Sequence, residues 1–375
     1  MKVAIVGGGF AGLIFAVKLA EAGVRVTVYE EHSAVGVPRH CTGLVSMRTV
    51  RLIGDPALSS VENVYELVRL VGRASSVTVL VEGGVARLDR RALEEKLLEK
   101  AERLGARIEL NSRVDRVSAD GSVKARGSWE SYDLVLLAEG YMGALRRALG
   151  LTHEPRVVYG VNRDYLVPAR GRAIEVYLGE RYPHGFFAWR IPRGSETTLG
   201  LGAREKRVAT RLLDRLEREL ALGEPRATYG GTVVLGPPSS RIRAGRVLVV
   251  GDAAALNKPL TGGGLYPNAL AAEIAGRLIR RGGSLVESVE ASVAHVAREM
   301  RVLAPIARLA HENPVLVEEA LRALERALEG ELMRLDYDRH GENLVAVATR
   351  ILRSRGALGL LNTRALASLA SSLLG

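Results

Sequence analysis

The first thirty residues fit one supersecondary structure and few others. Lys2 to Val6 is a short apolar run, typical of a strand buried on both faces, and Gly7, Gly9 and Gly12 follow it with the spacing GxGxxG. In a strand–turn–helix unit the first glycine permits the tight turn. The second lets the backbone approach a pyrophosphate, and the third lets the helix pack on the strand. The sequence therefore predicts a dinucleotide site at this turn.

The rest of this unit narrows the choice of dinucleotide. A helix is expected over Leu13 to Ala22, ended by Gly23, and Val24 to Tyr29 is expected to form a second strand, closed by Glu30. A carboxylate there accepts hydrogen bonds from ribose hydroxyls and repels a 2′-phosphate. FAD or NAD is thus favoured over NADP, and a tight turn without ligand is the alternative. Further cofactor contacts are predicted at Phe10, Ala11 and Glu31.

A second glycine-rich segment lies more than two hundred residues later. Gly245 to Val250 is predicted as a buried strand that leads into Asp252, at the strand end where open α/β sheets bind ligands. Asp252 suits the ribityl chain of a flavin, although capping a helix is the commoner task of such a residue. An apolar helix is expected over Leu265 to Ile279, and its N-terminus would favour negative charge on a reduced flavin. The two segments together predict one extended FAD site, with contacts at Gly251, Asp252, Pro259, Gly262, Gly263, Gly264 and Leu265.

Three segments resemble the geranylgeranyl reductase family, of the digeranylgeranylglycerophospholipid reductase type, within the flavoproteins of para-hydroxybenzoate hydroxylase-like fold. They are the glycine turn with Glu30, the run Pro38 to Ser46, which fits the family pattern R-x-C-x-G-x-x-S, and Gly251 to Gly264. The resemblance covers about residues 1–285. It implies an FAD-dependent enzyme that reduces isoprenoid double bonds in the synthesis of archaeal-type lipids, and it places Arg39, Cys41 and Arg90 at the cofactor.

Cys41 is the candidate catalytic residue. It is the one cysteine of the chain, so it can form neither an intramolecular disulfide nor a multi-cysteine metal site, and no metal is expected. A lone cysteine is usually an inert buried side chain, but its place in the family pattern favours a functional role. Hydride transfer to one alkene carbon requires a proton on the other. A thiol tuned by Arg39 or His40 could supply that proton or form an adduct with the flavin.

A weaker likeness marks the substrate region. Tyr182 to Pro192 is similar to the family's substrate-domain pattern Y-x-W-x-F-P, and the alternative is plain sheet core. Strands are expected at 157–162, 173–178, 185–192 and 197–203, followed by an amphipathic helix over 205–222. Asp133 to Gly140 resembles the group's strand ending in Ala-Asp-Gly, with Glu139 in the aspartate's place. The predicted substrate contacts are Tyr182, Phe187, Trp189 and Pro192.

The predicted fold class is α/β. A Rossmann-like FAD-binding domain covers 1–150 and 240–285, with 45–85 available to the substrate domain. An antiparallel-sheet substrate domain covers 151–239, and a helical region covers 286–375. Those C-terminal helices are expected to pack as a bundle; a lipid tunnel or a helix on a membrane surface, such as 357–374, are the alternatives.

Composition limits the partners. The net charge is +11, carried by 46 arginines and 7 lysines against 42 acidic residues. A solvated basic surface explains this, and the functional alternative is attraction to an anionic partner, namely nucleic acid, anionic lipid or an acidic electron donor. The donors considered are NAD(P)H, reduced deazaflavin and ferredoxin. No nucleic-acid motif is present and aromatic residues are 5% of the chain, so nucleic acid is not expected. The abundance of ionic groups and the absence of glutamine hint at a thermophile.

Location and chemistry leave alternatives. Neither a signal peptide nor an apolar run that could span a bilayer is found, so a cytoplasmic protein is expected, with peripheral contact to a membrane left open. The same fold also serves flavin-dependent monooxygenases and halogenases, and Trp189 to Pro192 partly matches the halogenase pattern W-x-W-x-I-P, without its first tryptophan. A non-catalytic FAD or lipid-binding protein is the third hypothesis.

Overall fold

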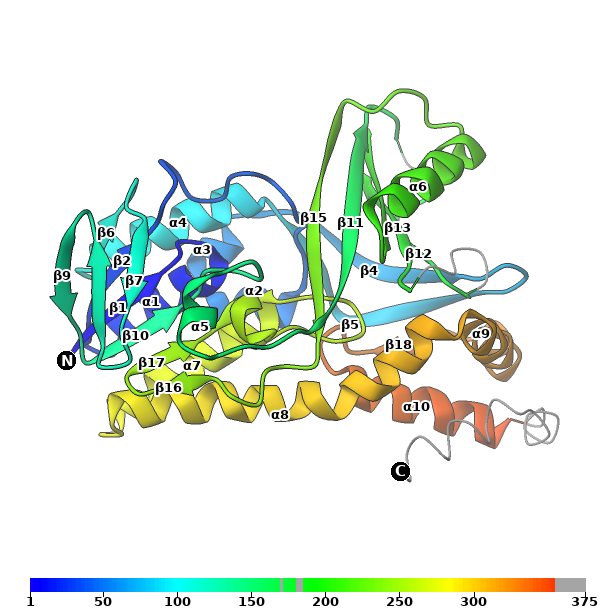
Figure 1. Cartoon of the computed structure of the whole chain (residues 1–375). Coiled ribbons are helices and arrows are strands. Elements are labelled where there is room, and N and C mark those ends of the chain that lie inside the picture. The colour runs from blue at the N-terminus through cyan, green and yellow to red at the C-terminus, as the bar shows by residue number, and fades with distance from the viewer. Residues whose placement is uncertain (169–170, 180–184, 355–375) are drawn as a thin grey trace. The chain divides into compact units, whose positions relative to one another are not determined.

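Three sheets organise the chain, which the computed structural model describes over residues 1–168, 171–179 and 185–354 (Figure 1). They belong to two compact units. The first comprises 1–62, 87–157 and 234–304, and the second comprises 63–86, 158–233 and 305–375. The C-terminal helices are therefore divided between the two units and do not form a unit of their own.

A six-stranded sheet forms the core of the first unit, in the order β16-β17-β10-β1-β2-β6. Its strands pair in parallel except β16, which is antiparallel to β17. The order reverses at β1, which has β2 on one side and β10 on the other, so the carboxyl end of β1 is the switch point where such sheets bind ligands. The strands are β1 (Lys2–Val6), β2 (Arg25–Tyr29), β6 (Arg107–Glu109), β10 (Leu134–Leu137), β16 (Arg243–Ala244) and β17 (Val247–Val249).

Helices cover this sheet, and a small antiparallel sheet accompanies it. Helix α1 begins at Phe10, directly after the glycine turn and earlier than the expected Leu13. It packs closely on α7, because a Cβ built at Gly276 would lie 2.8 Å from the carbonyl oxygen of Lys18. The elements are α1 (Phe10–Ala20), α2 (Met47–Ile53), α3 (Asp55–Leu58), α4 (Arg90–Arg103), α5 (Leu145–Ala148), α7 (Leu265–Arg280), β7 (Val114–Val117), β8 (Ser122–Ala125) and β9 (Ser128–Ser131).

The second sheet runs β15-β11-β14-β13-β12-β4-β5-β18, with β3 also paired to β5. Strands β11 to β14 are antiparallel neighbours, as the sequence predicts, but β12 pairs with β4 and β18 with β5 in parallel. The sheet is therefore mixed. Its strands are β3 (Leu44–Ser46), β4 (Val61–Val71), β5 (Ser76–Leu88), β11 (Arg156–Tyr165), β12 (Ile174–Tyr177), β13 (Ala188–Arg193), β14 (Glu196–Ala203), β15 (Ala227–Gly236) and β18 (Met333–Leu335).

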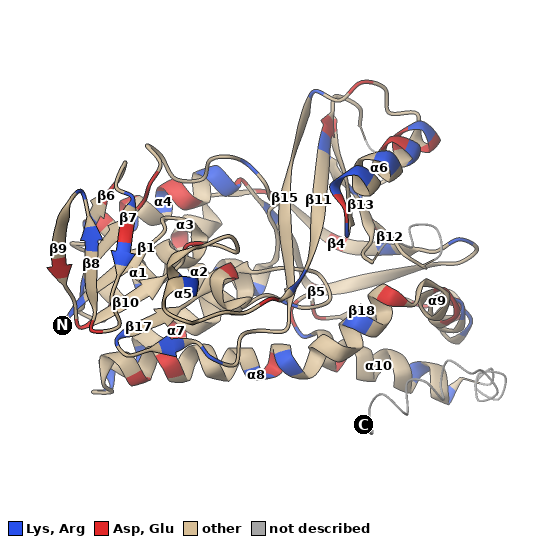
Figure 2. Ribbon diagram, viewed as in Figure 1, with Lys and Arg blue, Asp and Glu red and all other residues tan. Residues whose placement is uncertain are grey.

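Helix α6 (Lys206–Leu220) covers one face of strands β11 to β14. Its apolar face inserts Leu213 and Leu216, both fully buried, against Leu199 and Leu201 of β14. The exposed face of α6 carries Lys and Arg beside Asp and Glu (Figure 2), including the ion pair Arg215–Glu219 at 2.9 Å. Because α6 covers this face, the opposite face of the sheet is the one available for other contacts in this unit.

The C-terminal region contains α8 (Leu285–Glu312), α9 (Pro314–Leu328), β18 and α10 (His340–Arg353). The helices agree with the expected pattern, but β18 is a strand inside a region predicted to be wholly helical. That strand has three residues, too few to show a period, and the hydrogen bonds that define it come from β5. The expected surface helix at 357–374 lies outside the described residues.

Glu318 fixes α9 to the turn between β4 and β5. Its carboxylate, 2% exposed, accepts hydrogen bonds from the backbone N–H groups of Arg73 (2.8 Å) and Ala74 (3.1 Å) and from the Ser75 hydroxyl (3.3 Å). Burial acts to raise the pKa of Glu318, but these donors and Arg322 outweigh it, and the pKa lies below its usual value. The turn accepts the carboxylate because Gly72 has no Cβ, which would lie 2.6 Å from Glu318 Oε2.

We expect Glu318→Gln to lower the free energy of unfolding by about 1.5–3 kcal/mol at pH 7, since three donors lose a charged acceptor. A depressed pKa stabilises the folded state above the unfolded value of about 4.3 and loses that effect as the pH falls through the folded pKa. The gap between wild type and variant should therefore close below about pH 4. Urea denaturation at several pH values measures this. Glu319→Gln on the same helix is the control, and a gap that is constant with pH would contradict the assignment.

No helix among residues 1–168, 171–179 and 185–354 combines the length and apolar character needed to cross a membrane.

Candidate active site

The first glycine turn has the geometry that its spacing predicts. Gly7 adopts φ +106°, a left-handed conformation that favours glycine. A Cβ at Gly12 would overlap the carbonyl oxygen of Gly7, so only glycine lets α1 start this close to β1. The space beside Gly9 is open, since nothing lies within 4 Å of a Cβ built there. That opening is where backbone can approach a phosphate at the start of α1.

Glu30 lies beside the same turn. Its side chain is buried, and Oε2 accepts a hydrogen bond from the Gly8 N–H at 2.6 Å. Oε1 accepts one from the His32 N–H at 2.9 Å. Oε1 also lies 2.5 Å from His32 Nδ1, whereas Oε2 keeps a second lone pair, so capacity remains there for a ribose hydroxyl. Glu31, by contrast, is exposed and forms only a loose ion pair with Arg113 at 3.9 Å.

The second glycine-rich segment meets the first one in space. A Cβ built at Gly251 would lie 2.8 Å from the Cβ of Ala11, so Gly251 contacts the first turn of α1. Gly251 has φ +66°, and its N–H donates to Asn268 Oδ1 at 3.0 Å. Asn268 Nδ2 in turn donates to the carbonyl oxygens of Leu256 (3.0 Å) and Gly264 (2.8 Å). One buried amide thus holds both ends of the segment, and the two predicted halves of the cofactor site form one surface.

Asp252 faces the loop before α7. Asn257 Nδ2 donates to Asp252 Oδ1 at 2.9 Å. A Cβ at Gly264 would lie 3.3 Å from that Nδ2 atom, so the amide of Asn257 lies over the glycine run. Two polar atoms of this loop, Asn257 Oδ1 and Thr261 Oγ1, are buried and have no hydrogen-bond partner among the described residues. Buried polar groups are normally satisfied, so these two oxygens fit a loop that contacts a ligand able to donate hydrogen bonds.

The segment around Cys41 is a loop fixed against the end of β5. Gly43 adopts φ +79°, and a Cβ there would overlap the Leu88 carbonyl oxygen. The Leu88 N–H donates to the Gly43 carbonyl at 2.9 Å, and the Gly43 N–H donates to Cys41 Sγ at 3.4 Å. Ser46 closes the pattern as the N-cap of α2, accepting from the Thr49 N–H at 2.8 Å. The glycine and serine of the family pattern therefore position the loop that carries Cys41.

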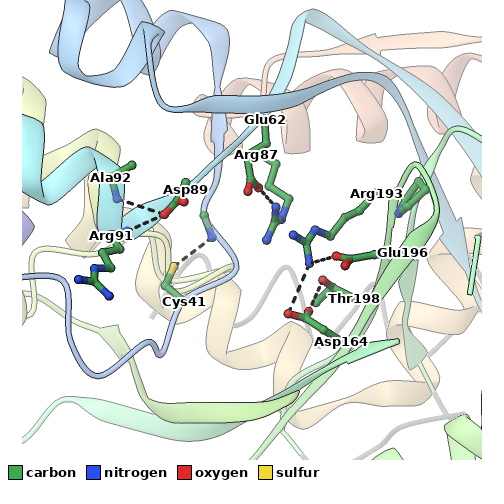
Figure 3. A network of polar contacts seen from close by, with 12 residues as sticks. Cys41, Glu62, Arg87, Asp89, Arg91, Ala92, Asp164, Arg193, Glu196 and Thr198 are labelled. Atoms are coloured by element: carbon green, nitrogen blue, oxygen red, sulfur yellow. Dashed lines mark hydrogen bonds and ion pairs between the residues drawn. The ribbon is translucent and has the colours of Figure 1, made fainter. Parts of the chain in front are cut away.

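Arg90 joins Cys41 to the first glycine turn. Arg90 hydrogen-bonds the Glu94 carboxylate and interacts electrostatically with Cys41, and its guanidinium lies 5.7 Å from the ring centre of Phe10. Burial acts to lower the pKa of Arg90, but Glu94 and then Cys41 outweigh it and raise the pKa above its usual value. Asp89 caps this helix by accepting from the N–H groups of Arg91 (3.0 Å) and Ala92 (3.1 Å), as Figure 3 shows. A permanent positive charge thus lies close enough to Cys41 to interact with it.

Three further residues that the sequence singled out, Arg39, His40 and Glu139, make other contacts. Arg39 and His40 are exposed, and His40 Nδ1 lies 3.0 Å from the Pro38 carbonyl oxygen. Glu139 accepts from the N–H groups of Leu145 (2.9 Å) and Arg146 (2.7 Å), so it caps the short helix α5. The charge expected beside Cys41 from its chain neighbours is thus provided by Arg90, a residue distant in sequence.

The predicted substrate contacts belong to the second unit, except Tyr182, which lies outside the described residues. On the sheet face opposite α6, Trp189 Nε1 donates to the buried Asn162 Oδ1 at 3.0 Å. The Trp189 ring occupies the place that a Cβ at Gly200 would take. Phe187 packs edge-on against Trp189, with ring centres 5.8 Å apart. Glycine on β14 therefore makes room for an aromatic surface.

A polar cluster occupies the end of the same strands (Figure 3). Arg193 pairs with Glu196 at 2.9 Å and with the buried Asp164 at 3.4 Å. Asp164 also accepts a hydrogen bond from the Thr198 hydroxyl at 2.6 Å. The carbonyl oxygen of Pro192 accepts a hydrogen bond from the Tyr65 hydroxyl. The sheet face thus changes from aromatic to charged along its strands.

Four residues near the predicted site were not predicted from the sequence: Glu94, Asn257, Lys258 and Asn268. Glu94 lies one helical turn after Arg90, a spacing that puts the two on one face of α4 and could have indicated the pair. The other three occur within or just after the second glycine segment, but their burial carries no sequence signal. In the part of the chain that is described, no group of three or more His, Cys, Asp or Glu side chains is placed to hold a metal.

The chain is similar to known proteins over most of its length. It is 32% identical over 305 residues to digeranylgeranylglycerophospholipid reductase 1 of Methanopyrus kandleri, covering 74% of this chain and 79% of the relative. The chain belongs to the digeranylgeranylglycerophospholipid reductase family. The family resemblance and the oxidoreductase class predicted from the sequence are thereby confirmed.

Solved structures support the same fold for this reductase family member. A geranylgeranyl bacteriochlorophyll reductase-like protein from Thermoplasma acidophilum superposes with a TM-score of 0.77, at 18% identity, covering 99% of this chain and 98% of that one. A probable FAD-dependent monooxygenase from Pseudomonas aeruginosa gives 0.66, at 18% identity, covering 93% and 99%. Residues 5–38 match the model of an NAD(P)-binding Rossmann-like domain. At these identities the structures show the fold alone, and they confirm the predicted α/β class.

Proposed function

We propose that this reductase uses FAD to saturate carbon–carbon double bonds of isoprenoid chains in archaeal-type membrane lipids. The contact between Gly251 and Ala11 carries the proposal, because it makes one continuous site from two glycine segments more than two hundred residues apart. A mononucleotide needs one such segment, whereas FAD extends across both. The name of the Methanopyrus relative supports the class of substrate.

The residues present fit FAD. Gly9 and the start of α1 would hold the pyrophosphate, and Glu30 would accept from the adenosine ribose. Asp252 would accept from the ribityl hydroxyls. Asn257 Oδ1, buried and without a protein partner, needs a donor that the ribityl hydroxyls or the flavin ring N–H provide. The N–H groups at the start of α7 would face the pyrimidine edge of the ring.

The chemistry divides between cofactor and protein. When bound and reduced, FAD supplies a hydride from its N5 atom. Cys41 supplies the proton for the second alkene carbon, and the thiolate left behind regains a proton from solvent. The guanidinium of Arg90 interacts electrostatically with Cys41, so its positive charge would attract the negative charge that remains when the proton leaves. Glu94 holds Arg90 in this position.

The second unit provides the surface for an apolar chain. Phe187 and Trp189 form an aromatic wall whose one polar atom, Trp189 Nε1, is satisfied by Asn162. An isoprenoid contacts such a wall without leaving a polar group unpaired. The alkene is unactivated, so positioning contributes much of the rate.

The direct test needs no knowledge of the natural electron donor. Purified protein is extracted for ligands, and the FAD-loaded protein is reduced with dithionite under anaerobic conditions and mixed with digeranylgeranylglycerophospholipid. We expect FAD in the extract and reoxidation of the flavin matched by saturated lipid in mass spectrometry. Absence of a flavin would refute the cofactor. Bound flavin without lipid reduction would favour a non-catalytic binding protein, and rapid NADPH oxidation by oxygen with a phenol would favour a monooxygenase. The electron donor and contact with a membrane stay predictions.

A further inference from the structure

Lys258 is a buried cation in the loop between Asp252 and α7. It is 3% exposed. Its backbone starts the glycine turn, because the Lys258 N–H donates to the Gly263 carbonyl at 3.1 Å and the Gly262 N–H donates to the Lys258 carbonyl at 2.8 Å. Its side chain lies along the same turn, since a Cβ at Gly263 would be 3.0 Å from Lys258 Cε and 3.7 Å from Nζ. The ammonium is therefore held against the glycine run.

The surroundings of this ammonium mark it as part of a ligand site. Asn257, its neighbour in the chain, is also 3% exposed and has an unsatisfied acceptor, Oδ1, in the same loop. Gly264 is the N-cap of α7, and the N-terminus of that helix adds partial positive charge beside the ammonium. In a protein interior charges are weakly screened, so cation and helix end act together on any negative charge that develops beside the loop.

We propose that Lys258 raises the reduction potential of the bound flavin by stabilising negative charge on the reduced ring. This inference rests on the proposed FAD site. It assigns Lys258 an electrostatic role toward the flavin ring. Oxidised FAD has a neutral ring and gains little from the ammonium. The reduced ring carries a negative charge when its N1 position is deprotonated, and it gains much more. Lys258 therefore shifts the equilibrium toward the reduced cofactor, the form that delivers hydride.

The presence of a lysine instead of an arginine at position 258 fits a point charge held in a narrow space. Arginine supplies 46 of the 53 basic side chains of this chain, and only 7 are lysines. Lysine carries a compact point charge on a narrow stem, whereas the planar guanidinium of arginine is bulkier. A narrow stem fits beside Gly263, where even a methyl group would contact Cε.

The test compares wild type with Lys258→Met, which keeps the length of the stem and removes the charge. The midpoint potential of bound FAD is measured by anaerobic redox titration, and the dissociation constants of oxidised and reduced FAD are measured separately. We expect the variant to bind oxidised FAD within threefold of wild type and to bind reduced FAD at least tenfold more weakly. When binding of oxidised FAD is unchanged, a tenfold weaker binding of reduced FAD lowers the potential by about 30 mV for a two-electron couple. Lys124→Met on β8, outside the loop, controls for loss of a positive charge and should leave the potential unchanged.

The outcomes separate this inference from the proposed function. Equal weakening of both forms, with an unchanged potential, would show that Lys258 only supports the loop. If Lys258→Met does not fold, the wild-type protein and a second variant provide the test. The wild type must bind reduced FAD more tightly than oxidised FAD, and Lys258→Gln must bring the two dissociation constants closer together. None of these measurements uses a lipid, so they stand if lipid reduction fails. Absence of FAD binding would instead refute the cofactor proposal.

Discussion

Replacing Cys41 by alanine is expected to slow lipid reduction by about 100-fold or more, since removal of a positioned general acid typically costs 10² to 10⁴ in rate. The flavin should stay bound, because Gly43 and Ser46, which fix the loop, are unchanged. Arg90 should also stay in place, because it retains Glu94. The measurement is anaerobic reoxidation of dithionite-reduced protein by the lipid in a single turnover.

The controls for Cys41 distinguish proton transfer from packing. Cys41→Ser keeps a proton donor of similar size and should recover part of the rate, with a changed pH profile and a larger solvent isotope effect. Thr42→Ser, in the same loop, should leave the rate near wild type. Lipid reduction at the wild-type rate in Cys41→Ala would remove the catalytic assignment. Loss of flavin in that variant would make Cys41 a structural residue.

Replacing Glu94 by alanine is expected to destabilise the first unit by about 3–5 kcal/mol, the usual cost of leaving one partner of a buried ion pair uncompensated. Arg90 and Glu94 have side chains only 12% and 6% exposed, and the pair keeps the pKa of Arg90 above its usual value. Arg90 is charged at every accessible pH, so it cannot escape the cost by losing its proton. Denaturant unfolding followed by flavin fluorescence and by circular dichroism measures the loss.

The same helix supplies a matched control. Arg91 and Glu95 form an ion pair of the same spacing one residue further along, but their side chains are 63% and 46% exposed. Glu95→Ala should therefore change stability little, because water screens an exposed pair. Glu94→Gln keeps an acceptor for Arg90 and should fall between the two. Equal losses in the free energy of unfolding for Glu94→Ala and Glu95→Ala would show that burial of the Arg90–Glu94 pair does not affect stability.

Local geometry was predictable from the sequence where one residue type alone fits. Gly7, Gly12 and Gly251 all occur where a side chain would meet backbone or a neighbouring helix, and the glycine spacing alone indicates the turns. Strands β1, β2 and β17 were predictable because buried parallel strands are short apolar runs, whereas β6 and β16 were not predicted. Strand β18 was not, because its hydrogen-bond partner β5 is remote in the chain.

Only part of the arrangement around Cys41 could be predicted from the sequence. The cysteine could be selected from its pattern, and Arg90 could be associated with the cofactor from the family likeness. Their direct contact could not be read from the sequence, and the chain neighbours Arg39 and His40 were the natural candidates for tuning the thiol. The contact arises because the Gly43 loop packs on the end of β5, one residue before the cap of α4.

By itself the sequence indicated a dinucleotide-binding turn and located the two glycine segments, because φ angles and close approaches are local properties of a residue and its neighbours. Tertiary structure alone decided that Gly251 contacts Ala11, that Arg90 contacts Cys41 and that Lys258 is buried. Burial and charge pairing depend on residues brought together from distant parts of the chain. No local pattern records which elements will cover a side chain or which charge will face it.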